Sequence, residues 1–137
     1  AQTPDYDLVI LGGGAAAFAA ITEASRRDLS TAMVNTGLPI GGTCVNVGCV
    51  PSKHLLAVAE AALQRENPFN AVRYPEEPTV DWAAALDGTD ERVGRFRQEN
   101  YIDVAEHFET DIYEGYGQLV DDTTIEVVDG ADEGARI

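Results

Sequence analysis

The two cysteines of this 137-residue chain, Cys44 and Cys49, stand five positions apart in the segment TCVNVGCVPSK, residues 43–53. Two thiols cannot form a four-ligand zinc site alone, and the two histidines, His54 and His107, do not have ligand spacing. The spacing therefore favours a disulfide or a reactive dithiol. A purely structural bridge and two unpaired core thiols are the alternatives.

A bridge between these two cysteines requires a break in regular helix geometry. Residues i and i+5 of an ideal helix are about 8.7 Å apart at Cα, whereas a disulfide needs roughly 4.4–6.8 Å. Gly48 permits unusual backbone angles and Pro51 cannot donate to the preceding turn, so the sequence supplies the break. Because a short loop gives a bridge little stabilising effect and a strained bridge is easily reduced, we interpret the pair as redox-active.

A glycine-rich strand-to-helix turn lies upstream of the cysteines. Residues 6–11 are predicted to form a buried strand, and GGGAAA at residues 12–17 follows directly. This sequence fits the pattern GxGxxA, with Gly12 for the tight turn, Gly14 for close approach to a pyrophosphate and Ala17 for helix packing. The predicted helix over residues 14–27 offers free N–H groups and a positive dipole end to the same group.

The second strand is predicted over residues 30–35 and ends at Asn35. Dinucleotide folds usually carry an acid at this position, which binds the ribose hydroxyls. An amide can still bind a hydroxyl, but without charge assistance the contact should be weaker.

The glycine turn does not by itself separate FAD from NAD, but the nearby dithiol does. A flavin converts hydride transfer into thiol–disulfide chemistry, which a nicotinamide does not usually perform directly. No signal peptide precedes the segment, so we expect a reducing, cytoplasmic compartment, where a persistent disulfide is more often catalytic than structural.

The segment GGTCVNVGCVPSK, residues 41–53, resembles the active-site segment of the pyridine nucleotide–disulfide oxidoreductases. That family includes dihydrolipoamide dehydrogenase, glutathione reductase and mercuric reductase, and the resemblance extends over residues 5–128. Dihydrolipoamide dehydrogenases usually have Leu and Ile at the positions of Val45 and Val50, and glutathione reductases usually have Lys at Ser52. These positions, together with residues 67–69 and 92–101, resemble the mercuric reductase branch most.

The resemblance implies roles for individual residues. Cys44 would be the interchange thiol that faces substrate, Cys49 would lie against the flavin as the charge-transfer thiolate, and Lys53 would lie near the reactive nitrogen of the flavin. The implied FAD-binding residues are Gly12, Gly14, Ala15, Asn35, Gly42, Thr43, Lys53 and Gly117. Electrons would pass from NADPH through FAD and the dithiol to substrate. In the mercuric branch, both thiolates would transiently coordinate Hg(II), a soft ion that suits soft ligands.

The resemblance also implies that residues 1–137 are the N-terminal part of an FAD-binding domain. By this resemblance, the full-length protein would be a homodimer. The nicotinamide and dimer-interface domains of the family would lie outside residues 1–137. Dihydrolipoamide dehydrogenase is the alternative identity for the full protein. A truncated FAD-binding module without turnover is the alternative for the chain alone.

The fold class that we predict is α/β: a partial Rossmann-like FAD-binding domain with a parallel sheet, helices and a C-terminal β-hairpin. Helices are predicted over residues 50–66 and 81–107, the second with Asp81 as N-cap and an interruption near Gly88. Residues 67–79 are predicted to form a loop. The hairpin pairs residues 113–120 with 123–128. At least one central parallel strand is missing, so an exposed sheet edge is expected.

The chain is strongly acidic, with a formal net charge of −15 and an isoelectric point near 4.2. Lys53 is the sole lysine, and no acid lies between Ser30 and Ala59. The simple interpretation is a solvated acidic surface. We favour the alternative, adaptation to high salt, where counterions screen the repulsion between the acids. The same charge disfavours nucleic acid as a partner. The longest apolar run, residues 8–21, is too short to span a membrane.

Overall fold

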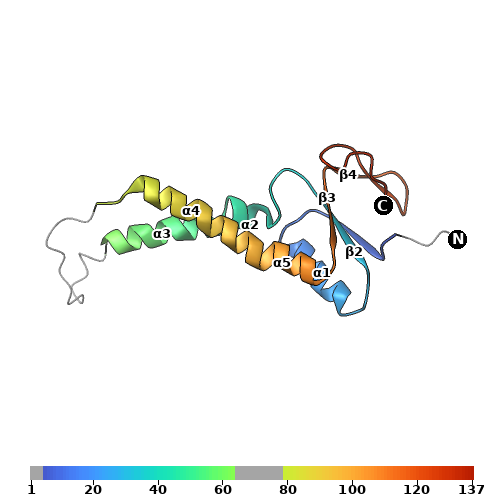
Figure 1. Ribbon diagram of the computed structural model, residues 1–137, viewed down its shortest axis with the longest axis horizontal. Helices are drawn as coiled ribbons and strands as arrows, with labels where there is room; N and C mark the ends of the chain where they lie inside the picture. The colour runs from blue at the N-terminus through green and yellow to red at the C-terminus, as the bar shows by residue number, and fades with distance from the viewer. Residues whose placement is uncertain (1–4, 64–78) are drawn as a thin grey trace.

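The computed structural model describes residues 5–63 and 79–137 (Figure 1). The strands are β1 (Leu8–Leu11), β2 (Thr31–Asn35), β3 (Asp111–Glu114), β4 (Gly117–Leu119) and β5 (Ile125–Val127). The helices are α1 (Ala15–Ser25), α2 (Gly42–Asn46), α3 (Cys49–Leu63), α4 (Trp82–Arg97), the π-helical turn η2 (Gln98–Ile102) and α5 (Asp103–His107). The predicted loop over residues 67–79 falls almost entirely outside the described residues.

A parallel three-stranded sheet in the order β1-β2-β3 forms the centre of the fold. Side chains of β2 alternate between two apolar layers, as the period of a strand requires. Met33 packs with Phe18 and Ile21 of α1 on one face. Val34 packs with Ile125 and Val127 on the other face. The result is three layers, with α1 and α5 on one side of the sheet and the β4–β5 hairpin on the other (Figure 1).

The predicted strand over residues 113–120 is wrong, because the structure divides it. Asp111–Glu114 is a third parallel strand, with Val34 opposite Tyr113 and Asn35 opposite Glu114. The chain turns at Gly115, where a Cβ would overlap the carbonyl oxygen of Asp129. Only β4 and β5 form the antiparallel hairpin, joined through the predicted turn at residues 121–122.

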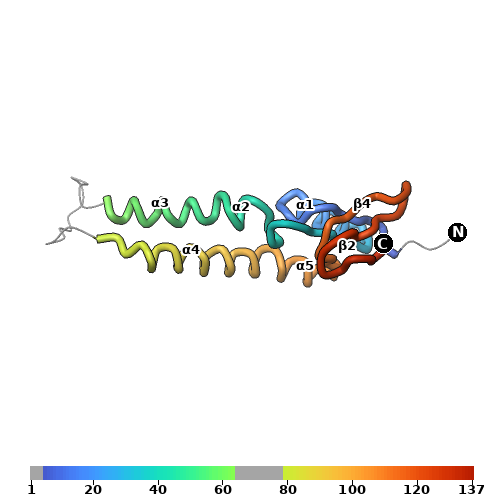
Figure 2. The backbone as a smooth tube through the Cα atoms, turned by 90° about the horizontal axis from the view of Figure 1, so that it is seen from above, coloured from blue at the N-terminus to red at the C-terminus, as the bar shows by residue number. Residues whose placement is uncertain are grey.

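Helices α3 and α4 lie side by side and project together away from the sheet (Figures 1 and 2). Asp81 is the N-cap of α4, as predicted, and its Oδ1 accepts from the Ala84 N–H at 3.0 Å. The predicted interruption near Gly88 is wrong. The helix continues through Gly88, and a Cβ there would approach Nε2 of His54 to 3.2 Å, so this glycine allows α3 and α4 to pack closely.

The irregular part of this second helix is η2, ten residues beyond Gly88. Nε2 of Gln98 donates to Oδ1 of Asp103 across it at 2.7 Å. Tyr101 in the turn packs edge-on against Phe18, with ring centroids 4.8 Å apart. The π turn therefore joins the projecting helix to the core of the sheet layer.

Strand β1 has one hydrogen-bonded neighbour, β2, among the described residues. The expected exposed sheet edge is thus present at β1. None of the helices in residues 5–63 and 79–137 has the length and apolar character needed to cross a bilayer.

Candidate functional site

The glycine turn after β1 presents a helix N-terminus that no side chain caps. Gly12 has φ +112 and donates its N–H to the Val34 carbonyl at 2.8 Å, which fixes the turn to β2. Gly14 is the N-cap of α1, with no side-chain cap and no acid in the first turn. Ala15 follows as the exposed first residue of the helix. Free N–H groups at such a start favour an anionic group.

A second glycine turn, Gly41-Gly42, lies directly against the first. The Gly41 N–H donates to the Gly13 carbonyl at 2.8 Å. A Cβ on Gly42 would lie 2.9 Å from the Cα of Gly14, and Gly42 has φ +64. Glycines on both sides leave room for a close backbone approach to a ligand, as a pyrophosphate requires. The chain's residues therefore fit a dinucleotide at this place.

The cysteines flank the break between α2 and α3. Helix α2 ends at Asn46 and α3 begins at Cys49, so the predicted break in the helix is confirmed. A Cβ on Gly48 would lie 2.9 Å from the Thr43 carbonyl oxygen and 3.2 Å from the Cα of Cys44. Only glycine allows the chain to fold back this closely on the first cysteine.

Both cysteines are free, exposed thiols in this structure. They lie within hydrogen-bonding reach of each other, and this hydrogen bond to Cys49 is the main cause that raises the pKa of the Cys44 thiol. The arrangement is an exposed dithiol. A thiolate is the reactive form for disulfide exchange and for metal binding.

The raised pKa of Cys44 leads to a prediction for thiol reactivity. Replacing Cys49 by alanine removes the hydrogen bond, so the pKa of Cys44 should fall and its alkylation at about pH 8 should become faster. A thiolate of lower pKa is also a weaker nucleophile, which slows alkylation. This loss is smaller than the gain from the larger thiolate fraction, because the Brønsted coefficient is about 0.4–0.5. Peptide mass spectrometry of iodoacetamide-treated chain measures the rate at Cys44. With Val47→Ala as a control, an unchanged or slower rate in Cys49→Ala would contradict the account.

The remaining predicted cofactor residues occupy different places. Thr43 lies in α2 beside Cys44, and Lys53 lies one helical turn after Cys49, on the same face of α3. Lys53 lines a cavity of about 250 Å³ with His54 of α3 and Arg92 of α4. Neither Lys53 nor Arg92 forms an ion pair with an acid among the described residues.

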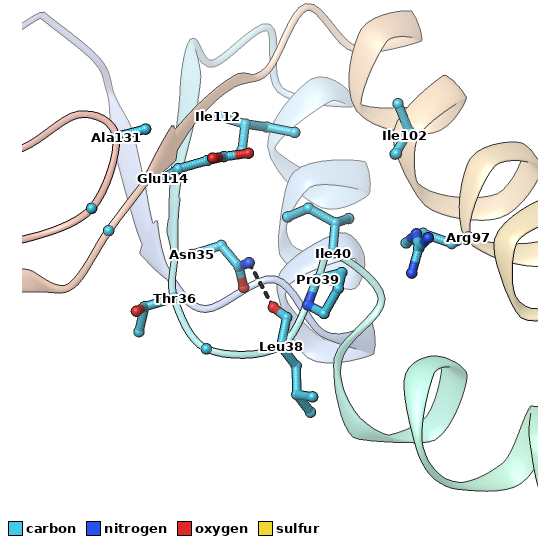
Figure 3. Close-up of a pocket in the computed structure, with 13 residues that line it drawn as sticks. Asn35, Thr36, Leu38, Pro39, Ile40, Arg97, Ile102, Ile112, Glu114 and Ala131 are labelled. Carbon is cyan, nitrogen blue, oxygen red and sulfur yellow. Dashed lines mark hydrogen bonds between the residues drawn. The ribbon is translucent and has the colours of Figure 1, made fainter.

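Asn35 lines a larger cavity, of about 440 Å³, at the carboxyl ends of β2 and β3 (Figure 3). Its Nδ2 donates to the Leu38 carbonyl at 2.9 Å. A Cβ on Gly13 would lie 2.6 Å from its Oδ1, so Asn35 adjoins the glycine turn. Gly117 does not line this cavity. It lies on the opposite face of the sheet, where a Cβ would meet Leu11 and Val34.

Asn46 and Arg97 are site residues that sequence reasoning missed. Nδ2 of Asn46 donates to the carbonyls of Pro39 at 2.8 Å and Gly42 at 2.9 Å, with a longer contact of 3.4 Å to Ile40. Its Oδ1 accepts from Nη1 of Arg97 at 2.7 Å. Asn46 thus ties the second glycine turn to α4. Its position inside the cysteine segment was the available signal, but its distant partner in α4 could not be read from sequence.

Comparison with known proteins supports the class that the fold and the site indicate. Residues 6–136 match the family model of the pyridine nucleotide-disulphide oxidoreductases. The chain belongs to this family, whose FAD-binding domain is Rossmann-like, and the predicted α/β fold class is confirmed. Membership implies FAD and a pyridine nucleotide as the redox cofactors of the family.

Mercuric reductases are among the relatives of this chain. The mercuric reductase of Streptomyces lividans is 45% identical over 126 residues, which are 89% of this chain and 26% of that protein. That of Staphylococcus aureus is 42% identical over 124 residues, 90% of this chain and 22% of that protein. A chloroplastic dihydrolipoyl dehydrogenase of Arabidopsis thaliana is 38% identical over 91 residues, 60% of this chain and 16% of that protein. The chain therefore spans about a quarter of the length of the mercuric reductases that it matches.

Proposed function

We propose that this chain is the FAD-binding, dithiol-bearing part of an NADPH-dependent oxidoreductase that reduces Hg(II). The observation that carries the proposal is the pair of free thiols, Cys44 and Cys49, within hydrogen-bonding reach at the break between α2 and α3. Helix α2, which holds Cys44, starts at the glycine contact between Gly14 and Gly42. A dithiol and a dinucleotide cradle are therefore built from one continuous stretch of chain.

FAD is the cofactor that this arrangement suits. Bound flavin supplies the conversion between hydride transfer and thiol–disulfide chemistry. The backbone N–H groups of the first turn of α1, which begins at Ala15 after Gly12 and Gly14, would hold the pyrophosphate of FAD. Gly42 and Thr43 would border the same group from the start of α2.

The two thiols and Lys53 would act at the redox end of the site. Cys44 and Cys49 as thiolates would bind Hg(II) together, because soft sulfur ligands prefer a soft metal ion. Lys53, one turn after Cys49, places a positive charge on the face of α3 that carries this cysteine. The remainder of the cofactor site, a pyridine nucleotide site and a homodimer interface are proposed to lie in other parts of a longer, cytoplasmic protein.

Turnover by the full protein tests the substrate. Purified in KCl with FAD, it should oxidise NADPH when Hg(II) is added and release mercury vapour, and Cys44→Ser and Cys49→Ser should both stop this reaction. Oxidation of dihydrolipoamide with NAD, without Hg(II) reduction, would replace the proposal by a dihydrolipoamide dehydrogenase. Activity with neither substrate would leave an FAD-binding module without turnover and overturn the proposal.

We further propose that the chain works at high salt. In residues 5–63 and 79–137 the ion pairs are those of Glu23 with Arg26 at 3.5 Å and with Arg27 at 2.9 Å, so most acids have no cation beside them. Screening should weaken the repulsion that follows from a net charge of −15. The thermal unfolding midpoint should therefore rise as KCl increases from about 0.1 M to about 2 M. A flat or falling midpoint would contradict high-salt adaptation.

A further inference from the structure

The end of β2 lacks the group that this fold ordinarily uses to bind a ribose. In dinucleotide folds an acid after the second strand accepts hydrogen bonds from the ribose hydroxyls. Asn35 occupies that position, and its Nδ2 is already engaged with the Leu38 carbonyl at 2.9 Å. As acceptors, the side chain therefore offers the ribose hydroxyls one neutral oxygen, Oδ1, which faces Gly13, and no carboxylate. A carboxylate from another element could supply what is missing.

The sheet register places such a carboxylate beside Asn35. Asn35 and Glu114 are Cα partners at the carboxyl ends of β2 and β3. Partnered residues in neighbouring strands point to the same face of a sheet, and neighbouring strands are about 4.8 Å apart. The face is identified by Met33 and Ile112, the partners two positions earlier, which pack against α1 and α5. Asn35 and Glu114 therefore share the helix-covered face.

The same cavity contains both side chains. Figure 3 shows Asn35 and Glu114 extending from the strand ends in the same direction, with Ile40 and Arg97 on the far side of the space. The cavity has a volume of about 440 Å³. Its wall of Ile40, Ile102 and Ile112 is apolar and suits the flat surfaces of a nucleoside.

Glu114 is held in place and its carboxylate is uncommitted. The backbone N–H of Glu114 donates to Oδ2 of Asp132 at 2.7 Å, and its carbonyl accepts from the Asp132 N–H at 3.1 Å. Its carboxylate has no hydrogen bond or ion pair with another residue in the part of the chain that the structure describes. A fixed backbone with a free acid is the arrangement that a ligand hydroxyl can use.

We propose that Glu114 binds the ribose hydroxyls of the cofactor's adenosine half, in place of the acid that Asn35 does not provide. The proposal rests on the proposed binding of FAD and adds the residue that recognises one part of it. The carboxylate of Glu114 accepts from the 2′- and 3′-hydroxyls, while Oδ1 of Asn35 and the glycine turn border the sugar on the side of the pyrophosphate. Glu114 thereby favours ribose over a sugar without these hydroxyls.

Calorimetry of the chain with two nucleotides tests this contact. ADP and 2′,3′-dideoxy-ADP differ only in the hydroxyls, and FAD binding is followed in parallel by its fluorescence. Glu114→Gln keeps one neutral carbonyl acceptor and loses one charged hydrogen bond, so it should weaken FAD and ADP about tenfold. It should leave 2′,3′-dideoxy-ADP within twofold. The matched control is Glu133→Gln, which removes one negative charge from the neighbouring loop without lining the cavity.

The outcomes separate this inference from the function on which it rests. If the unaltered chain binds neither FAD nor ADP, the proposal that this part of the protein holds the adenosine half of FAD fails, before any role of Glu114 is considered. If the chain binds FAD and Glu114→Gln changes nothing, the role of Glu114 is refuted while the proposed function stands. Equal weakening of ADP and its dideoxy analogue would also refute it, because the loss would not depend on the hydroxyls. Any effect that Glu133→Gln reproduces is one of net charge alone and refutes the contact.

Discussion

Replacing Gly42 by alanine should lower the affinity of the chain for FAD by about 100-fold or more, which corresponds to about 2.7 kcal/mol. The added Cβ would lie 2.9 Å from the Cα of Gly14, so one of the two turns must move. Backbone atoms cannot rotate away as a flexible side chain does, and overpacking of this kind costs about 1–3 kcal/mol. The positive φ of +64 adds strain for any residue with a Cβ. Both effects act on the turn that would face the pyrophosphate.

Gly134→Ala is the matched control for the Gly42 prediction. Gly134 has φ +90, so alanine brings comparable backbone strain, but a Cβ there meets nothing within 4 Å. It should cost about 1 kcal/mol of stability and leave FAD affinity within twofold. Fluorescence titration with FAD measures the affinities, and circular dichroism confirms that both variants are folded. Similar affinity losses in the two variants would mean that contact between the glycine turns has no role in binding.

Replacing Asn46 by leucine should lower the free energy of unfolding by about 3 kcal/mol, with a loss of about 1 kcal/mol for each neutral hydrogen bond and more for the charged one. The variant removes the bonds to the carbonyls of Pro39 and Gly42 and leaves the Arg97 guanidinium without its acceptor at 2.7 Å. Leucine has the better helix propensity, so propensity alone predicts a small gain. The sign of the change therefore distinguishes the hydrogen-bond network from local helix preference.

Asn100→Leu is the control for the Asn46 prediction. The Nδ2 of Asn100 donates to one carbonyl, that of Phe96, at 3.0 Å on an exposed helix surface. Urea unfolding of the chain, followed by circular dichroism, should show a change below about 1 kcal/mol for this variant. If Asn46→Leu is no more destabilising than Asn100→Leu, Asn46 does not hold the second glycine turn against α4.

Local sequence was sufficient for the two parts of the site that depend on glycine. The turn at Gly12 and the helix break at Gly48 follow from conformations and close approaches that only glycine allows, and both are where the sequence placed them. The N-cap at Asp81 was equally readable, because its hydrogen bond is to Ala84, three residues away.

Features that depend on distant partners could not be predicted. Residues 113–117 alternate in a way that reads as one strand, and the division at Gly115 follows from its contact with Asp129. Asn46 and Arg97 are 51 residues apart, and Asn35 and Glu114 meet only through the register of β2 and β3. Tyr101 in the π turn η2 likewise packs against Phe18 of α1, a distant partner that local sequence does not reveal.

A visible spectrum of the chain with FAD measures whether Cys44 and Cys49 are a redox dithiol beside a bound flavin. The chain would be incubated with FAD in about 2 M KCl, a concentration that screens its charge, and freed of unbound cofactor. Spectra would be recorded before and after mild reduction of the cysteines. We expect retained flavin and a new long-wavelength band on reduction, and we expect Cys49→Ala to abolish this band without loss of flavin. A folded chain that retains no flavin, or one whose flavin spectrum does not respond to the thiols, would contradict this expectation.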